Sequence, residues 1–285
     1  MEDFRAFIQR KTRDAISGSL TALRTIEDDS TAFATRAIAN AWTRAHYDGP
    51  FHLPMQGTIG AAPFVSLVFV QSKDGNTGTD NPEELGGGPL DKHLIYEGLT
   101  RVAVDAVLAG AKTADNENTF FSVWHPELVA LRTELGLPRH PAQIVVTGTG
   151  CIDPDASRVF NVPEVAVFVV AGPVGCRVLE RAIADRSWVQ LVPMSGDDLR
   201  TPLEYLGRKC GIGRISAVGG RTTASALLDQ GLVQDVCLTT TDRCAGQPNT
   251  PFYVGGRPPR MTPIVRKRAL DAEYPILFEH FAVQR

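Results

Sequence analysis

Residues 214–233, RISAVGGRTTASALLDQGLV, decide how this chain can fold. The first five residues are a short apolar run typical of a buried strand, and Gly219 and Gly220 interrupt it. The residues that follow predict a helix capped by Thr222 or Thr223. The stretch therefore predicts a strand, a glycine turn and a helix.

A turn of two glycines before a helix is suited to an anionic ligand. Because glycine has no Cβ atom, a ligand can approach the backbone closely. The free N–H groups and the positive dipole end of the helix favour a phosphate or pyrophosphate. The alternative is a tight turn that binds nothing, since a lone pair of glycines is a short motif.

The composition is that of an ordinary globular protein. The chain has 285 residues, of which 43% are hydrophobic, enough for one large domain or two small ones. The net charge of −3, with no basic stripe, argues against a nucleic acid partner. No apolar run approaches the roughly 20 residues of a membrane span, and the amino terminus lacks the apolar stretch of a signal peptide. A cytoplasmic location and no membrane partner are the expectation.

Cysteine and histidine spacings predict neither disulfides nor a metal site. The five cysteines lack any C-x-x-C pair and are expected to be reduced, mostly as core residues: Cys151, Cys176, Cys210, Cys237 and Cys244. The histidines show no H-x-x-x-H or H-E-x-x-H spacing, so no metal is expected.

The chain divides after residue 48 into an amino-terminal extension and one domain, 49–285. The extension is predicted to be helical, with one helix around Phe4 and Phe7 and a second from Thr31 to His46. The sequence leaves three roles open for this extension: it covers part of a sheet, it forms a dimer contact, or it acts as a lid over a ligand. Residues 49–63 are a connector rich in glycine and proline.

Three predicted strands end in polar or glycine-rich turns. They are Phe64–Gln71, which should be buried on both faces, Asp105–Ala109 and Gln143–Thr147. The turns after them begin at Ser72, Gly110 and Gly148. Open α/β sheets bind ligands at such strand ends. Neither the second nor the third turn has the spacing of a nucleotide-triphosphate loop or a complete dinucleotide fingerprint.

The alternation of strands and helices continues to residue 240, and the last two apolar segments, 264–270 and 276–283, should form an antiparallel pair. The predicted fold class is α/β, with a mixed, mostly parallel sheet and helices on both faces.

Several segments in this order resemble one known family. They are Ser72-Lys73-Asp74-Gly75, Leu85-Gly86-Gly87 with Pro89 and Asp91, Arg101 with the run from Asp105 to Thr113, and Val218-Gly219-Gly220 with Leu227-Leu228 and Leu232-Val233. This set is similar to the reductase domain of riboflavin biosynthesis, the dihydrofolate-reductase-like carboxyl-terminal half of the bacterial deaminase-reductase. The likeness spans roughly residues 62 to 283.

The resemblance implies an often dimeric, NADPH-binding enzyme. Such enzymes transfer a hydride to the sugar of a phosphoribosylamino-pyrimidine. By the resemblance, the cofactor pyrophosphate would lie on Gly219, Gly220, Arg221 and Thr222, with Gly110 and Thr113 along the nicotinamide half and Thr147 near the 2′-phosphate. On the substrate side, the resemblance would place Asp74 as the catalytic residue, beside Ser72. Lys73 and Lys112 lie at strand ends that face the expected cleft and are candidate partners for a substrate phosphate, with solvated lysines as the alternative.

The sequence also departs from the family pattern. Val218 stands where the family carries a glutamate, Lys112 where it carries a glycine and Lys73 where it carries an apolar residue; Glu117-Asn118 is the nearest match to an expected D-N-P segment. The alternatives are therefore a nucleotide-binding paralogue without turnover, or an unrelated scaffold whose glycines only form turns. Asp74 has the alternative of a turn residue. Arg101 is a candidate for binding a substrate phosphate, but an arginine late in a helix also complements the helix dipole, and that alternative is favoured.

Overall fold

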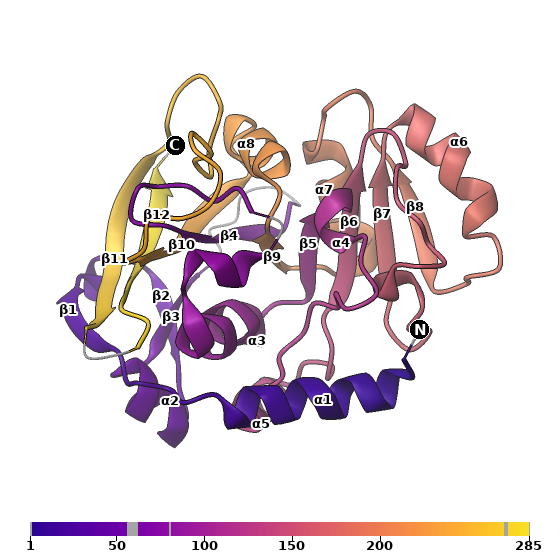
Figure 1. The fold of residues 1–285 in the computed structure, drawn as a ribbon. Helices are drawn as coiled ribbons and strands as arrows, with labels where there is room; N and C mark the ends of the chain where they lie inside the picture. The colour runs from indigo at the N-terminus through magenta and orange to yellow at the C-terminus, as the bar shows by residue number, and fades with distance from the viewer. Residues whose placement is uncertain (1, 56–61, 80, 271–272, 285) are drawn as a thin grey trace.

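The computed structural model describes residues 2–55, 62–79, 81–270 and 273–284. Part of the predicted connector, residues 56–61, therefore lies outside the described residues. The described residues form a ten-stranded sheet with strand order β1-β11-β12-β10-β4-β9-β5-β6-β7-β8, and a separate two-stranded sheet of β2 and β3 (Figure 1).

The strands of both sheets are β1 (Arg24–Asp28), β2 (Thr35–Ile38), β3 (Phe51–Pro54), β4 (Phe64–Gln71), β5 (Ala106–Gly110), β6 (Ala142–Thr147), β7 (Val167–Ala171), β8 (Val189–Pro193), β9 (Arg214–Val218), β10 (Val233–Thr241), β11 (Arg260–Ala269) and β12 (Ile276–Gln284). The helices are α1 (Phe4–Ser17), η1 (Ser30–Ala32), α2 (Ala41–Tyr47), η2 (Pro82–Leu85), the π-helix η3 (Leu90–Leu99), α3 (Thr100–Val102), α4 (Ala111–Ala114), α5 (Pro126–Glu134), η4 (Arg158–Phe160), α6 (Pro173–Ala182), α7 (Arg200–Cys210) and α8 (Arg221–Asp229).

The predicted fold class is confirmed. Strands β10, β4, β9, β5, β6, β7 and β8 pair in parallel, and β12, β11 and β1 add antiparallel pairs at one edge. The antiparallel pairing of β11 with β12 is the predicted terminal pair.

Both faces of the sheet are covered, because consecutive side chains of a strand point to opposite faces. In β4, Val65, Leu67 and Phe69 join the core under α7 and α8, whereas Val68 joins the core that includes residues of η3, α5 and α6. The prediction that this strand is buried on both faces is therefore confirmed.

The prediction for the amino-terminal extension is right for the first helix and wrong for the second. Helix α1 is capped by Asp3 and packs Phe7 edge-on against Trp124, with ring centroids 5.6 Å apart. Residues 35–38 instead form β2, which pairs antiparallel with β3. The α-helix α2 covers only residues 41–47 and is capped by Asn40.

The second helix was wrongly predicted because periodicity is judged over a short stretch of sequence, and β3, the strand that pairs with β2, lies beyond that stretch. In addition, β1 pairs with β11 at the edge of the main sheet, so the extension is not wholly helical. The boundary after residue 48 stays a prediction.

The five cysteines are free, as predicted. Cys237 is buried, and Cys176 and Cys210 pack against the core, whereas Cys151 and Cys244 are exposed. No helix among the described residues has both the length and the apolar character that crossing a membrane requires.

Candidate functional site

A cleft of about 1360 Å³ opens at the carboxyl ends of β5, β6 and β9. Its lining includes eight of the predicted site residues: Gly110, Lys112, Thr113, Thr147, Gly219, Gly220, Arg221 and Thr222. The carboxyl ends of parallel strands meet at one edge of a sheet, which is why turns distant in sequence come together here. The cleft exceeds the range of about 300–1000 Å³ typical of a pocket for one small molecule. It has room for two ligands.

The glycine turn between β9 and α8 forms one part of the lining. Gly219 and Gly220 both adopt left-handed φ values, 67° and 77°. A Cβ atom on Gly219 would lie 3.0 Å from Cγ2 of Thr113, so a side chain there would fill the space between the two turns. A residue other than glycine would be strained at both positions.

The amino terminus of α8 has no side-chain cap. Gly220 is the N-cap residue, and within the described part of the chain no side-chain cap hydrogen bond is made at this helix start. The predicted caps, Thr222 and Thr223, are wrong, because both lie inside the helix. Uncapped N–H groups at a helix start are a favourable place for an anion.

The turns after β5 and β6 lie beside the glycine turn. Gly110 leads directly into the short helix α4, which carries Lys112 and Thr113. The Thr147 hydroxyl accepts a hydrogen bond of 2.9 Å from the backbone N–H of Gly150. This bond shapes the Gly148-Thr149-Gly150 turn, in which Gly148 and Thr149 also line the cleft.

Three predicted site residues are not brought to the cleft. Ser72, Lys73 and Asp74 are absent from its lining, and the backbone N–H of Lys73 instead donates to the carbonyl of Arg243. Asp74 is exposed and accepts hydrogen bonds from Ser72 Oγ at 2.5 Å and Asn76 Nδ2 at 2.7 Å.

The contacts of Asp74 are those of a turn residue. The Ser72 hydroxyl, more than any other neighbour, lowers the pKa of this carboxyl group. An ionised, exposed carboxylate whose oxygens are occupied by its own turn is poorly placed for proton transfer. The geometry thus favours the turn interpretation, and the catalytic role of Asp74 has no support from its position.

Asp91 is a buried carboxyl group that the sequence interpretation did not assign to the site. It lies on η3, lines the cleft and is 7% exposed. Burial raises its pKa to about 6, and the neighbouring Thr239 hydroxyl opposes this shift. A carboxyl group with a pKa near neutrality in a cleft is suited to acid–base chemistry. In the sequence, Asp91 is part of the segment that resembles the family, without an assigned role in the site.

Arg101 is a second buried residue of this wall, at 1% exposure. Its guanidinium group lies over the ring of Tyr96, 4.4 Å from the centroid, and its Nη1 donates to the Ser122 carbonyl at 3.2 Å. Among the described residues, its Nε and Nη2 atoms have no hydrogen-bond partner. A planar cation with two unpaired donors is suited to a phosphate or carboxylate group.

Helix α1 completes the wall near Arg101. Its residues Arg10, Lys11 and Asp14 line the cleft. The Lys11 ammonium donates to both carboxylate oxygens of Glu97, at 2.8 and 3.1 Å.

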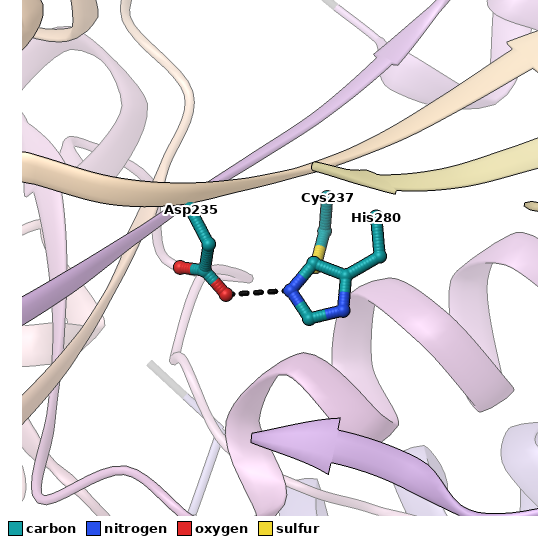
Figure 2. A group of neighbouring side chains, drawn as sticks. All are labelled: Asp235, Cys237 and His280. Carbon is teal, nitrogen blue, oxygen red and sulfur yellow. Dashed lines mark hydrogen bonds and ion pairs between the residues drawn. The ribbon is translucent and has the colours of Figure 1, made fainter. Parts of the chain in front are cut away.

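One buried cluster among the described residues has the donor types of a metal site. Asp235, Cys237 and His280 offer ligand atoms within 4.8 Å of one another on the paired strands β10 and β12 (Figure 2). His280 Nε2 lies 2.6 Å from Asp235 Oδ2, which is a direct hydrogen bond.

This arrangement does not fit an ion between the two groups. Two ligand atoms about 2.0–2.2 Å from the same tetrahedral ion are more than about 3 Å apart. We therefore describe the three residues as a hydrogen-bonded pair packed against a buried thiol. Sequence spacing missed the pair because its members come from different strands.

A protein-family model matches most of the chain. The RibD C-terminal domain matches residues 63–272. A 2,5-diamino-6-ribosylamino-4(3H)-pyrimidinone 5′-phosphate reductase from Archaeoglobus fulgidus is 25% identical over 195 residues, covering 68% of this chain and 83% of that protein.

Two solved structures share the fold. A pyrimidine reductase-like protein from Corynebacterium diphtheriae has a TM-score of 0.65 and 18% identity, covering 78% of this chain and 92% of its own. RibD from Acinetobacter baumannii has a TM-score of 0.60 and 18% identity, covering 79% of this chain and 58% of its own.

Proposed function

Because the chain belongs to the RibD C-terminal domain family, we propose that it is an NADPH-dependent reductase of a phosphoribosylamino-pyrimidine in riboflavin biosynthesis. The observation that carries the proposal is that one cleft joins an uncapped glycine turn to a wall containing Asp91 and Arg101. The glycine turn suits a dinucleotide, and the wall with Asp91 and Arg101 suits an anionic substrate that must receive a proton.

The cofactor end is assigned to the strand-end turns. Gly219 and Gly220 leave the space that a Cβ atom would fill, and the first turn of α8 presents free N–H groups to a pyrophosphate. Arg221 and Thr222 flank this turn, Gly110 and Thr113 would lie along the nicotinamide half, and Thr147 would lie near the 2′-phosphate. When bound, a reduced nicotinamide supplies the hydride.

The substrate end is assigned to the wall of η3 and α3. We place the phosphate of the substrate beside the guanidinium group of Arg101, whose buried Nε and Nη2 atoms have no hydrogen-bond partner among the described residues. In the reaction the bond from the sugar C1′ to the ring oxygen breaks and a C–H bond forms at C1′. The released oxygen needs a proton, and the carboxyl group of Asp91 donates it. The ring-opened ribityl chain is the product.

The A. fulgidus protein supports this substrate class, since its name describes a reductase of a ribosylamino-pyrimidinone 5′-phosphate. We test two substrates, that diamino-pyrimidinone compound and its deaminated form, 5-amino-6-(5-phosphoribosylamino)uracil. The first measurement is a fluorescence titration with NADPH and with NADH. The second follows the loss of reduced nicotinamide absorbance after substrate is added. NADPH binding with oxidation by either substrate is the expected result.

A second candidate is a paralogue that binds the nucleotide without turnover. Val218, at the position where the family carries glutamate, is fully buried in the core and does not line the cleft. The site therefore lacks a carboxylate at that position. Cofactor binding without oxidation by either substrate would favour this candidate, and no binding of NADPH or NADP would contradict both.

A homodimer, which the family resemblance implies, and a cytoplasmic location, which is the expectation from the sequence, are further parts of the proposal. Sedimentation equilibrium of the purified chain tests the dimer. Cell fractionation of the native host tests the location.

A further inference from the structure

Helix α1 lies outside the residues that match the family, 63–272, yet it forms part of the cleft wall. In Figure 1 it runs along the lower edge of the molecule, below the segment that ends in α3. Aromatic contacts hold it there, since the rings of Phe4 and Phe120 meet edge-on at 4.9 Å. The residues of α1 that face the cleft are therefore held in place.

Lys11 is the α1 residue with the strongest contact to this wall. Its ammonium and the Glu97 carboxylate are both nearly enclosed, with side chains 13% and 12% exposed. Burial alone would raise the pKa of Glu97, but the charges of Lys11 and Arg101 outweigh it, and the pKa is lowered. Glu97 is thus an ionised carboxylate that needs a cation.

His93 does not meet that need. Its Nδ1 lies 3.9 Å from a Glu97 oxygen, but burial lowers the pKa of His93 to about 4, so the imidazole is neutral at pH 7. The cations that act on Glu97 are Lys11, Arg101 and Lys92. Lys92 is itself paired with Glu83 at 2.5 Å. If Lys11 were absent, Arg101 would be the remaining cation whose charge acts most strongly on Glu97.

Glu97 and Arg101 lie on either side of a kink, because Glu97 and Gly98 have non-helical φ/ψ values and α3 begins at Thr100. Both side chains line the cleft, and the charge of Arg101 lowers the pKa of Glu97. An arginine and a carboxylate form strong, often bidentate pairs when water is excluded. Nevertheless, Arg101 keeps two donors unpaired while Glu97 is bound by Lys11. Lys11 and Arg101 are thus two cations beside the Glu97 carboxylate, and because Lys11 binds that carboxylate, the guanidinium group of Arg101 is left for a ligand.

We infer that Lys11 is a positioning residue that occupies Glu97 and so keeps Arg101 available for the phosphate monoester of the substrate. The identity of that ligand rests on the proposed function, whereas the exchange of partners between Lys11, Glu97 and Arg101 does not. The amino-terminal helix is on this view a determinant of substrate affinity rather than only a cover for the core.

The kinetic experiment uses the full-length chain with Lys11→Met, the double variant Lys11→Met/Glu97→Gln, and Arg13→Met as a control on an exposed face of the same helix. Loss of one charge-assisted contact to the phosphate should raise KM for the phosphorylated substrate about tenfold in Lys11→Met. The double variant should recover most of that loss, because no carboxylate remains to bind Arg101. The dissociation constant of NADPH should not change in any of them.

Lys11→Gln, which removes the charge but keeps a polar side chain, is the second variant should Lys11→Met fold poorly. An unchanged KM in both single variants would overturn the inference. So would a raised KM that the double variant does not recover, since that pattern indicates a packing role.

A crystal structure of a Lys11 single variant separates this inference from the proposed function. We expect the Arg101 guanidinium to move onto Glu97. If Arg101 keeps its place over Tyr96, the inference fails even if the enzyme is active. A different outcome is that Arg101 moves onto Glu97 in the variant, while the wild-type protein does not oxidise NADPH with either substrate. In that case the proposed function fails and the exchange of partners stands.

Discussion

Gly219 and Thr113 come from turns 106 residues apart in the sequence, yet a Cβ atom on Gly219 would lie 3.0 Å from the Thr113 methyl carbon. The two turns therefore meet, and the space between them exists only because residue 219 has no side chain. This contact joins the turn after β5 to the turn after β9 and gives the cleft its glycine-lined end.

Gly220→Val should weaken NADPH binding at least about tenfold, because a branched side chain at φ 77° strains the turn and covers the start of α8. Fluorescence titration measures the loss. Gly211→Val is the matched control, since Gly211 also has a left-handed φ, 70°, but its Cβ would meet open space away from the cleft. Equal losses in both variants would mean that general strain, not the turn, explains the effect.

Arg101→Met should reduce the preference for a phosphorylated substrate. Removal of the charge takes two donors from the phosphate, and we expect KM to rise about 10- to 100-fold with a smaller change for the dephosphorylated compound. Steady-state kinetics with both compounds measures this. A similar loss for both would place the phosphate elsewhere.

Asp91→Asn should lower kcat by about 10²-fold or more, since an amide cannot donate the proton. In the wild type, kcat should fall as the pH rises through about 6, where the Asp91 carboxyl group loses its proton. The variant should lose this pH dependence. A wild-type profile that is flat between pH 5 and 8, approximate limits that bracket this titration, would contradict the assignment.

The same variant should change how stability depends on pH. Burial raises the Asp91 pKa from 3.8 to about 6, so the folded state binds this proton more tightly than the unfolded state. The contribution of Asp91 therefore becomes less favourable as the pH rises from about 4 to 6, by up to about 3 kcal/mol. The difference in unfolding free energy between wild type and Asp91→Asn, measured with urea at several pH values, isolates this group.

Asp74→Asn tests the residue that the sequence favoured as catalytic. Because Asp74 is exposed and its oxygens bind Ser72 and Asn76, we expect NADPH affinity and kcat to stay within about twofold of wild type. Steady-state kinetics provides the check. A loss of kcat with unchanged cofactor affinity would restore the original assignment and require the loop to move toward the cleft.

Much of the sheet and one end of the cleft could be predicted from sequence. The apolar patterns of β4, β9 and α8 lie within each element, so they can be recognised from the local sequence. Gly219 and Gly220 mark a turn in which a residue with a side chain would be strained. Strand β2 could not be predicted in this way, because its pairing with β3 depends on residues beyond the local pattern.

The sequence by itself determined the order of strands and helices from residue 64 onward, the glycine turns at the strand ends and the family. Only the tertiary structure decided that Asp74 does not line the cleft, that Asp91 and Arg101 are buried in its wall, and that Lys11 binds Glu97 from 86 residues away. The physical reason is that secondary-structure propensity and hydrophobic periodicity depend only on the residues of a single helix or strand. Burial, pKa shifts and the choice among ion-pair partners arise when distant elements pack together and exclude water.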